Sequence, residues 1–502
     1  GEDTLVAVGI IRGGFAVVLL VVVGVHIGKV EGPLVPLEAH TGGVVVAAVG
    51  RHHEVGVAVI HGRTVVHETE AQGHPVVGPP FGRDIEGPVV APVTVGGLSS
   101  ADGIFHIDIE LFKAAPQGVG GTGFEAQVLE TPMLCIMNHQ MAVATKASRV
   151  CRATNRPVSE FGSRRAHGPW AATYGAKAAI IAGCAATSNI LTGVMYDYGS
   201  TGTMAHSYVT SFGCSVAGEF KAFDTYIKTH KGEPLILLID TYDTLKCGVL
   251  NAIKAFKENG IDDSYEAGYG IRLDSGDLAY LSMECRRLLD ENGFTGCRIF
   301  ATNSLDEYLI TDLERQGACI DSYGVGDAIA TSKAAPCFGN VYKLVQINGE
   351  AVIKRSEDKI KLINPGSQIT YRIMINDPSK GEIYKVDVTC LRGDELSRKI
   401  ENGETFTVCD EYDRYKYKTF EAGEYVAQTL QHKVIENGRR CVPTHTLAEK
   451  KAYYNSTLMH FSPSERRLIN PHYYKVDISD DLYNLKMGII NNIVTEIRNF
   501  KL

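Results

Sequence analysis

Several stretches of the sequence place carboxylate, guanidinium and hydroxyl side chains directly after short apolar runs. PLILLID ends at Asp240, and GYGIRLDSGD carries Arg272 and Asp274 at the end of another run. An arginine beside carboxylates suits a phosphorylated sugar, whose hydroxyls and bound Mg²⁺ need oxygen ligands. We therefore expect one binding site for an anionic, sugar-containing substrate. The further candidate contacts in these endings are Ser275, Gly276, Thr302 and Asn303.

Two more stretches are candidates for anion binding. GVGDAIATS contains Gly324, Gly326 and Thr331, and glycines let backbone N–H groups approach a phosphate closely. Gly-rich turns are also common where nothing binds. FGSRRAHG offers Arg164 and Arg165, which suit a bidentate contact with a carboxylate or phosphate. The alternative is that these two arginines are simply solvated on a loop.

A single histidine, His206, lies among small residues and hydroxyls in YGSTGTMAHSYVTSFG. One interpretation is a core histidine whose ring nitrogens are satisfied by neighbouring Ser and Thr side chains. The other is that the ring lines an active site at a strand end, where the small residues leave room for a substrate. The stretch by itself leaves both interpretations open.

The apolar runs alternate with amphipathic segments, and this alternation predicts β/α units. Each amphipathic segment closes with a glycine, the expected residue after a helix C-terminus, at Gly260, Gly293 and Gly317. Buried strands joined by such helices form a parallel sheet, most simply a barrel. The polar residues named above then lie at the carboxyl ends of the strands, the face that carries the active site in β/α barrels.

Composition narrows the class of protein. A chain of 502 residues with a net charge of −8 has room for two or three domains and gives no reason to expect nucleic-acid or membrane binding. Its 12 cysteines form no C-x-x-C pair, which favours reduced thiols in a cytoplasmic enzyme. The apolar run FAVVLLVVVGVHI is too short to span a membrane, and no cleavage-site pattern follows it.

The first part of the chain differs from the rest in amino-acid composition. Residues 1–100 contain 25 valines and 18 glycines, and no Tyr precedes Tyr174. The Val-rich runs show neither the period of a strand nor that of a helix. Residues 1–123 are therefore either an unusual Gly/Val-rich β region or not the natural product of the gene. We favour the second interpretation.

From about Phe124 to Leu502 the chain resembles the nicotinate phosphoribosyltransferase family. The stretches that carry the resemblance are NHQMAVATKASRV, EFGSRRAHG, TSNILTG, GTMAHSYVTSF, IDTYDT, GIRLDSGDL, SYGVGDAIATS and RRLINPHYY. Their joint occurrence in this order is highly specific. The resemblance implies that the chain joins nicotinate to 5-phosphoribosyl-1-pyrophosphate in NAD salvage, giving nicotinate mononucleotide and pyrophosphate. It also implies coupling to ATP hydrolysis, with Mg²⁺ as cofactor.

The family's architecture sets the expected fold and domains. It is the type II phosphoribosyltransferase fold, an irregular β/α barrel flanked by an α+β domain built from N- and C-terminal segments, usually as a homodimer. We expect the barrel in residues 124–345 and the C-terminal part of the flanking domain in residues 346–502. Residues 1–123 stand where the family's N-terminal domain belongs.

The resemblance also assigns roles to individual residues. His206 matches the family histidine that ATP phosphorylates, and Arg164, with Arg165 beside it, matches the arginine near the nicotinate carboxylate. Asp274 and the GVGDAIATS loop match contacts to the ribose and its 5-phosphate. Ser188 and Asn189 stand where relatives that use nicotinamide carry an Asp, which favours the acid as substrate.

Two departures from the family pattern leave alternatives open. The family's T-D-L-Y-Q-like motif, whose Tyr packs on the nicotinate ring, has no match in residues 1–123, and Asp327 adds an acid to the phosphate loop. The alternatives are a nicotinamide or quinolinate phosphoribosyltransferase, or an inactive relative that only binds ligand. The sequence leaves the metal ligands unassigned.

Overall fold

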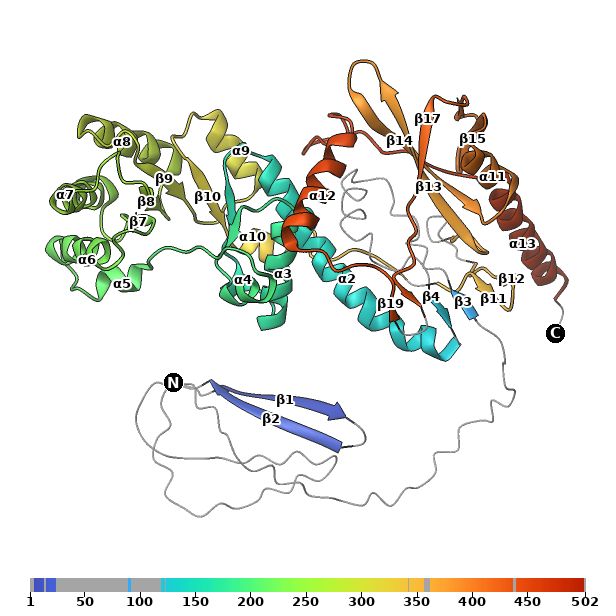
Figure 1. The fold of residues 1–502 in the computed structure, drawn as a ribbon. Coiled ribbons are helices and arrows are strands. Elements are labelled where there is room, and N and C mark those ends of the chain that lie inside the picture. The colour runs from blue at the N-terminus through green and yellow to red at the C-terminus, as the bar shows by residue number, and fades with distance from the viewer. Residues whose placement is uncertain are drawn as a thin grey trace, which may run out of the picture. The chain divides into compact units, whose positions relative to one another are not determined.

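The computed structural model divides into two units, Gly1–Asp84 and Ile85–Leu502 (Figure 1). In the first unit, β1 (Thr4–Arg12) pairs antiparallel with β2 (Phe15–Val23), which covers the first part of the apolar run. Most of the segment predicted to be anomalous lies outside the described residues. The structure describes residues 4–12, 15–23, 89–91, 119–121, 123–341, 343–355, 362–436 and 439–500.

Six parallel strands form the barrel, and their order around the sheet is β6-β5-β10-β9-β8-β7. β10 pairs with β5, so the first and last strands along the chain meet, while β6 and β7 remain unpaired edges. The predicted irregular β/α barrel is confirmed, and its irregularity is this opening. The strands are β5 (Val158–Glu160), β6 (Ala186–Thr187), β7 (Leu235–Leu238), β8 (Tyr269–Leu273), β9 (Arg298–Ala301) and β10 (Ser322–Val325).

Helices alternate with these strands (Figure 1). Gly260 ends one of them with a φ of 64°, a conformation that glycine adopts without a steric penalty. The helices of this region are α2 (Gly123–Arg152), α3 (Pro169–Ile181), α4 (Ile190–Tyr196), α5 (His206–Thr210), α6 (Val216–Thr229), α7 (Val249–Asn259), α8 (Leu278–Glu291), α9 (Glu307–Arg315) and α10 (Asp327–Ala330), with the short turns η1 (Ser163–Arg165) and η2 (Thr244–Gly248).

The C-terminal region is built on a second six-stranded sheet of order β16-β15-β20-β14-β13-β17. β20 (Val476–Ile478) lies in its middle, parallel to β14 and antiparallel to β15. The other strands are β13 (Gln368–Asp377), β14 (Gly381–Leu391), β15 (Phe406–Asp410), β16 (Tyr417–Phe420) and β17 (Tyr425–Thr429), and the helices are α11 (Glu395–Asn402), α12 (Leu447–His460) and α13 (Asp480–Asn499).

The remaining described strands form four two-stranded antiparallel sheets. They are β1 with β2, β3 (Val89–Ala91) with β4 (Val119–Gly121), β11 (Gln346–Ile347) with β12 (Glu350–Ala351), and β18 (Ile435–Glu436) with β19 (Arg439–Arg440). Three of them join strands that are consecutive along the chain and close in sequence, and β3 with β4 is the exception. The two large sheets fall on either side of the predicted boundary at residues 345 and 346, which itself stays a prediction. No helix among the described residues has the length and apolarity to cross a membrane.

A buried ion pair anchors the second sheet. Arg372 of β13 is fully buried and donates from Nε and Nη2 to the two carboxylate oxygens of Asp387 on β14, at 2.8 Å each. Tyr474 donates its hydroxyl to the same carboxylate at 2.9 Å, and the guanidinium carbon lies 4.7 Å from the ring centre of Tyr384. The bidentate contact compensates two charges that have lost their water.

We expect Asp387→Ala to lower the free energy of unfolding by about 3–5 kcal/mol, because it leaves the Arg372 guanidinium buried without its partner. Urea unfolding followed by circular dichroism measures the change. Glu291→Ala, which breaks the exposed pair with Arg287, is the control and should have little effect. Equal midpoints for wild type and Asp387→Ala would show that the ion pair does not stabilise the sheet.

Candidate active site

Three barrel strands deliver polar side chains to the same edge of the sheet. β7 is followed by Asp240, β8 by Asp274 and β9 by Thr302. Because the strands are parallel, their carboxyl ends meet, and the backbone N–H of Asp274 donates to Asp240 Oδ2 at 2.9 Å. The polar endings of neighbouring strands therefore come together, and their use as one binding site stays a prediction.

The guanidinium of Arg272 connects three separate segments of this cluster. Its Nη2 donates to Asp274 Oδ1 at 2.9 Å and its Nε donates to Thr302 Oγ1 at 3.0 Å. Its Nη1 donates to Thr203 Oγ1 at 2.6 Å, in the segment that precedes His206. The arginine therefore fixes the loops of the barrel mouth, a role that the sequence did not indicate, and direct contact with substrate stays a prediction.

Asp274 is held in its ionised form. Burial opposes ionisation, but the hydrogen bond from Thr302, the guanidinium of Arg272 and the nearby His206 together lower the pKa of Asp274. The result is a carboxylate that keeps its negative charge in a half-buried position. Such a group suits hydroxyl or cation ligands.

His206 faces this acidic cluster. It is the first residue of α5, its Nδ1 lies 3.2 Å from Thr241 Oγ1, and its Nε2 lies 3.5 Å from Asp274 Oδ2 and 3.7 Å from Asp240 Oδ1. The side chain is 42% exposed, so the interpretation as a buried core histidine is wrong. The expected strand end before it is also wrong, because residues 198–205 form only an isolated bridge, between Ser200 and Thr187.

Asp240 is a candidate site residue that the sequence analysis named only as a strand ending. Its side chain is 1% exposed. Oδ2 accepts from the Ser275 hydroxyl at 2.6 Å, whereas Oδ1 is buried and has no hydrogen-bond partner among the described residues. A buried carboxylate oxygen without a partner is costly unless a ligand or cation completes it. This atom makes Asp240 a candidate contact for a substrate or metal ion.

No group of three or more His, Cys, Asp or Glu side chains in the described part of the chain is arranged as a metal site. Mg²⁺ is commonly held by one or two carboxylates together with waters and substrate phosphates. Asp240 and Asp274 fit that pattern, since each presents a carboxylate oxygen towards His206 at 3.7 and 3.5 Å.

The loops after β5 and β6 carry the predicted carboxylate-binding residues. Arg164 and Arg165 lie in η1, both exposed and without a side-chain partner among the described residues. Asn189 is engaged: Oδ1 accepts from the N–H of Thr192 at 2.8 Å and caps α4, while Nδ2 donates to Ser163 Oγ at 3.0 Å. Asn189 thus shapes the loop with its own amide, and the arginines remain available to a ligand.

The glycines of the proposed phosphate loop have packing roles that the sequence did not reveal. A Cβ on Gly324 would lie 2.8 Å from Thr302 Cγ2 and 2.9 Å from the ring of Phe161. Gly326 precedes the four-residue helix α10, and the Thr331 hydroxyl donates to the carbonyl of Asp327 at 2.8 Å. Phosphate binding by this loop stays a prediction. Two further candidates have positive φ, Gly276 at 80° and the exposed Asn303 at 85°.

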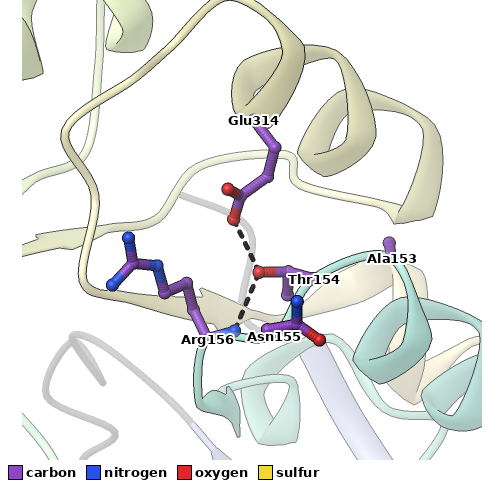
Figure 2. Close-up of a pocket in the computed structure, with 5 residues that line it drawn as sticks. All are labelled: Ala153, Thr154, Asn155, Arg156 and Glu314. Carbon is purple, nitrogen blue, oxygen red and sulfur yellow. Dashed lines mark hydrogen bonds between the residues drawn. The ribbon is translucent and has the colours of Figure 1, made fainter.

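A cavity of about 390 Å³ lies away from this cluster (Figure 2). It is lined by Ala153, Thr154, Asn155, Arg156 and Glu314. Arg156 precedes β5, so the cavity is at the amino end of that strand, whereas the predicted site residues follow the carboxyl ends. Figure 2 shows the Thr154 hydroxyl directed at Glu314, a contact of 2.6 Å that stabilises the turn after α2.

Comparison with characterised proteins decides the family. A nicotinate phosphoribosyltransferase from Bacillus subtilis is 37% identical over 380 residues, 74% of each chain. The chain belongs to the nicotinate phosphoribosyltransferase family. A nicotinate phosphoribosyltransferase from Dictyostelium discoideum is 30% identical over 73% of this chain and 69% of its own. The nicotinate phosphoribosyltransferase C-terminal domain matches residues 368–486.

Solved structures confirm the fold of this family member. Human nicotinic acid phosphoribosyltransferase superposes with a TM-score of 0.60 at 24% identity, covering 74% of this chain and 78% of its own. Nicotinate-nucleotide pyrophosphorylase from Pyrococcus furiosus superposes with a TM-score of 0.51 at 22% identity, covering 74% and 89%. The type II phosphoribosyltransferase fold expected from the sequence is therefore the observed one, and the chain is a phosphoribosyltransferase.

Proposed function

We propose that the chain joins nicotinate to 5-phosphoribosyl-1-pyrophosphate, giving nicotinate mononucleotide and pyrophosphate, and couples this reaction to ATP hydrolysis. The observation that carries the proposal is the cluster of His206, Asp240 and Asp274 at the mouth of a barrel from this family. A histidine between two carboxylates suits a site that handles phosphoryl groups and sugar hydroxyls. Such an enzyme belongs to NAD salvage in the cytoplasm.

The reaction requires positioning and charge stabilisation more than acid–base chemistry. The pyridine nitrogen is itself the nucleophile, and it displaces pyrophosphate from ribose C1 through an oxocarbenium-like state. Asp240 and Asp274 would hold Mg²⁺, and the ion would supply positive charge to neutralise the pyrophosphate. Arg164 and Arg165 are the exposed cations suited to the nicotinate carboxylate.

His206 is suited to accept the γ-phosphoryl group of ATP. When Nδ1 donates its proton to the Thr241 hydroxyl, Nε2 keeps the lone pair that a nucleophile needs. Transfer forms an N–P bond at the imidazole and breaks the bond between the β–γ bridging oxygen and the γ-phosphorus, releasing ADP. Hydrolysis of the phosphohistidine then returns the ring for another turnover.

The choice of the acid over the amide follows from the loop after β6. Ser188 and Asn189 introduce no negative charge there, and Asn189 Nδ2 donates to Ser163, the residue of η1 that precedes the two arginines. A carboxylate at either position would repel the carboxylate of nicotinate. The proposal is tested by assaying mononucleotide formation from nicotinate and from nicotinamide, each with and without ATP. Product from nicotinamide and none from nicotinate would contradict it.

We expect His206→Ala to abolish ATP hydrolysis and the ATP-driven gain in product, with the fold retained, because the phosphoryl acceptor is lost. Coupled measurement of ADP and nicotinate mononucleotide checks this result. The exposed His432→Ala is the control. Full ATP-stimulated turnover in His206→Ala would rule out the phosphohistidine.

Arg164→Lys should mainly impair the use of nicotinate, because a planar guanidinium fork becomes a point charge. Losing one charge-assisted hydrogen bond costs about 1.5–3 kcal/mol, which lowers kcat/KM for nicotinate by about tenfold to a hundredfold. Arg298→Lys, at the amino end of β9, is the matched control. If Arg164→Lys has wild-type kcat and KM, Arg164 does not bind the substrate.

A patch of exposed apolar side chains on α3 and α4 supports a homodimer. Val194 is 77% exposed and Ile190 is 70% exposed, and the patch adjoins the substrate loop that ends at Asn189. Large exposed apolar patches mark association surfaces. The patch consists of Trp170, Tyr174, Ile190, Leu191, Val194 and Met195.

A second copy of the chain is the expected occupant of this patch. Val194→Asp should shift the protein from dimer to monomer in sedimentation velocity, because burying a new carboxylate opposes association. Leu309→Asp, at an exposed apolar position on α9, is the control. An unchanged sedimentation coefficient in Val194→Asp would exclude the patch from the interface.

A further inference from the structure

Glu160, the last residue of β5, is a buried carboxyl group that the mechanism above does not use. The residue is 2% exposed, and no cation among the described residues is paired with it. Burial raises the pKa of Glu160, while hydrogen bonds from Thr187 and Gly162 lower it. A lone buried carboxyl at a strand end is costly, so its position calls for a compensating role.

The two oxygens of Glu160 connect the two loops that carry the predicted nicotinate contacts. Oε1 accepts from the backbone N–H of Gly162 at 2.5 Å, and Oε2 accepts from the Thr187 hydroxyl at 2.6 Å. Gly162 begins the turn that presents Arg164, and Thr187 ends β6 directly before Ser188. One side chain thus ties the arginine loop to the loop beside it.

Neighbouring contacts extend this connection into both loops. The N–H of Ser188 donates to the backbone carbonyl of Glu160 at 2.9 Å, and the N–H of Asn189 donates to Thr187 Oγ1 at 3.0 Å. Across the gap, Asn189 Nδ2 donates to Ser163 Oγ at 3.0 Å. The Glu160 carboxyl is therefore the buried centre of a network whose outer members include Ser188 and Asn189, the predicted substrate contacts.

Close packing leaves this network little freedom to shift. A Cβ on Gly162 would lie 2.4 Å from Ala330 Cβ and 2.6 Å from the carbonyl oxygen of Gly326. The turn carrying Arg164 is therefore pressed against the loop after β10 on one side and hydrogen-bonded to Glu160 on the other. Loss of the Glu160 contact releases the side that faces β6.

We propose that Glu160 is a positioning residue that sets the spacing between Arg164 and the Ser188–Asn189 loop, and so sets the affinity for the acidic pyridine substrate. This inference rests on the proposed function, because it takes nicotinate as the ligand of these loops. It predicts a selective effect. Affinity for nicotinate depends on Glu160. Affinity for 5-phosphoribosyl-1-pyrophosphate, which is assigned to the β7–β9 endings and the loop after β10, does not, because the Glu160 carboxyl is bonded to neither.

The test is steady-state kinetics of Glu160→Ala and Glu160→Gln, with each substrate varied in turn. Glu160→Ala should raise KM for nicotinate by about tenfold or more and leave KM for 5-phosphoribosyl-1-pyrophosphate within about twofold. Glu160→Gln should stay close to wild type, since its carbonyl oxygen accepts from Gly162 and its amide donates to the Thr187 hydroxyl. A wild-type KM in Glu160→Gln would show that the hydrogen bonds of Glu160, and not its charge, position the two loops.

Glu219→Ala is the matched control, because Glu219 is also fully buried and accepts a hydrogen bond from Asn251 at 2.8 Å, away from both loops. Its effects should not be selective for nicotinate. If Glu160→Ala does not fold, Thr187→Val removes the contact to Glu160 Oε2 together with the acceptor of the Asn189 N–H, and should raise KM for nicotinate selectively by about threefold.

Equal changes in both KM values, or a folded Glu160→Ala enzyme with an unchanged KM for nicotinate, would overturn the inference. An unchanged KM in Thr187→Val would do the same where Glu160→Ala cannot be measured. These outcomes differ from a failure of the proposed function itself, in which the wild-type protein forms no mononucleotide from nicotinate.

Discussion

The ion pair between Arg272 and Asp274 is the contact on which the barrel mouth depends. Arg272 lies in β8 and Asp274 directly follows its last residue, and the guanidinium Nη2 lies 2.9 Å from the carboxylate. The remaining nitrogens of the guanidinium then reach Thr302 and Thr203. The planar guanidinium has five N–H groups in fixed directions and donates to three separate segments at once. A lysine ammonium on its flexible stem would not fix the directions of three such hydrogen bonds.

The Arg272–Asp274 ion pair matters because the sheet is open between β6 and β7. No continuous ladder joins the two edge strands, and Ser200, in the segment that leads to His206, forms an isolated bridge with Thr187 of β6. Hydrogen bonds from side chains therefore replace the backbone ladder as the means of placing His206. A titratable ring held in this way can stay 42% exposed and still face two carboxylates.

The sequence predicted the barrel because apolar runs and helix-ending glycines are local signals, and the cluster followed because parallel strands share an edge. Features that depend on contacts distant in sequence were not predictable. The cap that Asn189 forms on α4 and the close approach of Gly324 to Thr302 gave no sequence signal, and the roles of both residues in binding stay predictions. Asp240 was visible as a strand ending, but its unpartnered oxygen appears only once β8 lies beside β7. Glu160 gave no signal, since its partners are defined by tertiary structure.

The place of β20 in the second sheet has a consequence for synthesis of the chain. β14 and β15 are not neighbours in the sheet, because residues 476–478 lie between them. Until those residues leave the ribosome, β14 and β15 each expose an unpaired edge to other chains. Arg372 and Asp387 are synthesised much earlier. The Tyr474 hydroxyl, which donates to the Asp387 carboxylate, is synthesised only just before β20. The barrel strands are complete by residue 325, so one half of the molecule can fold during translation while the other waits for nearly the whole chain.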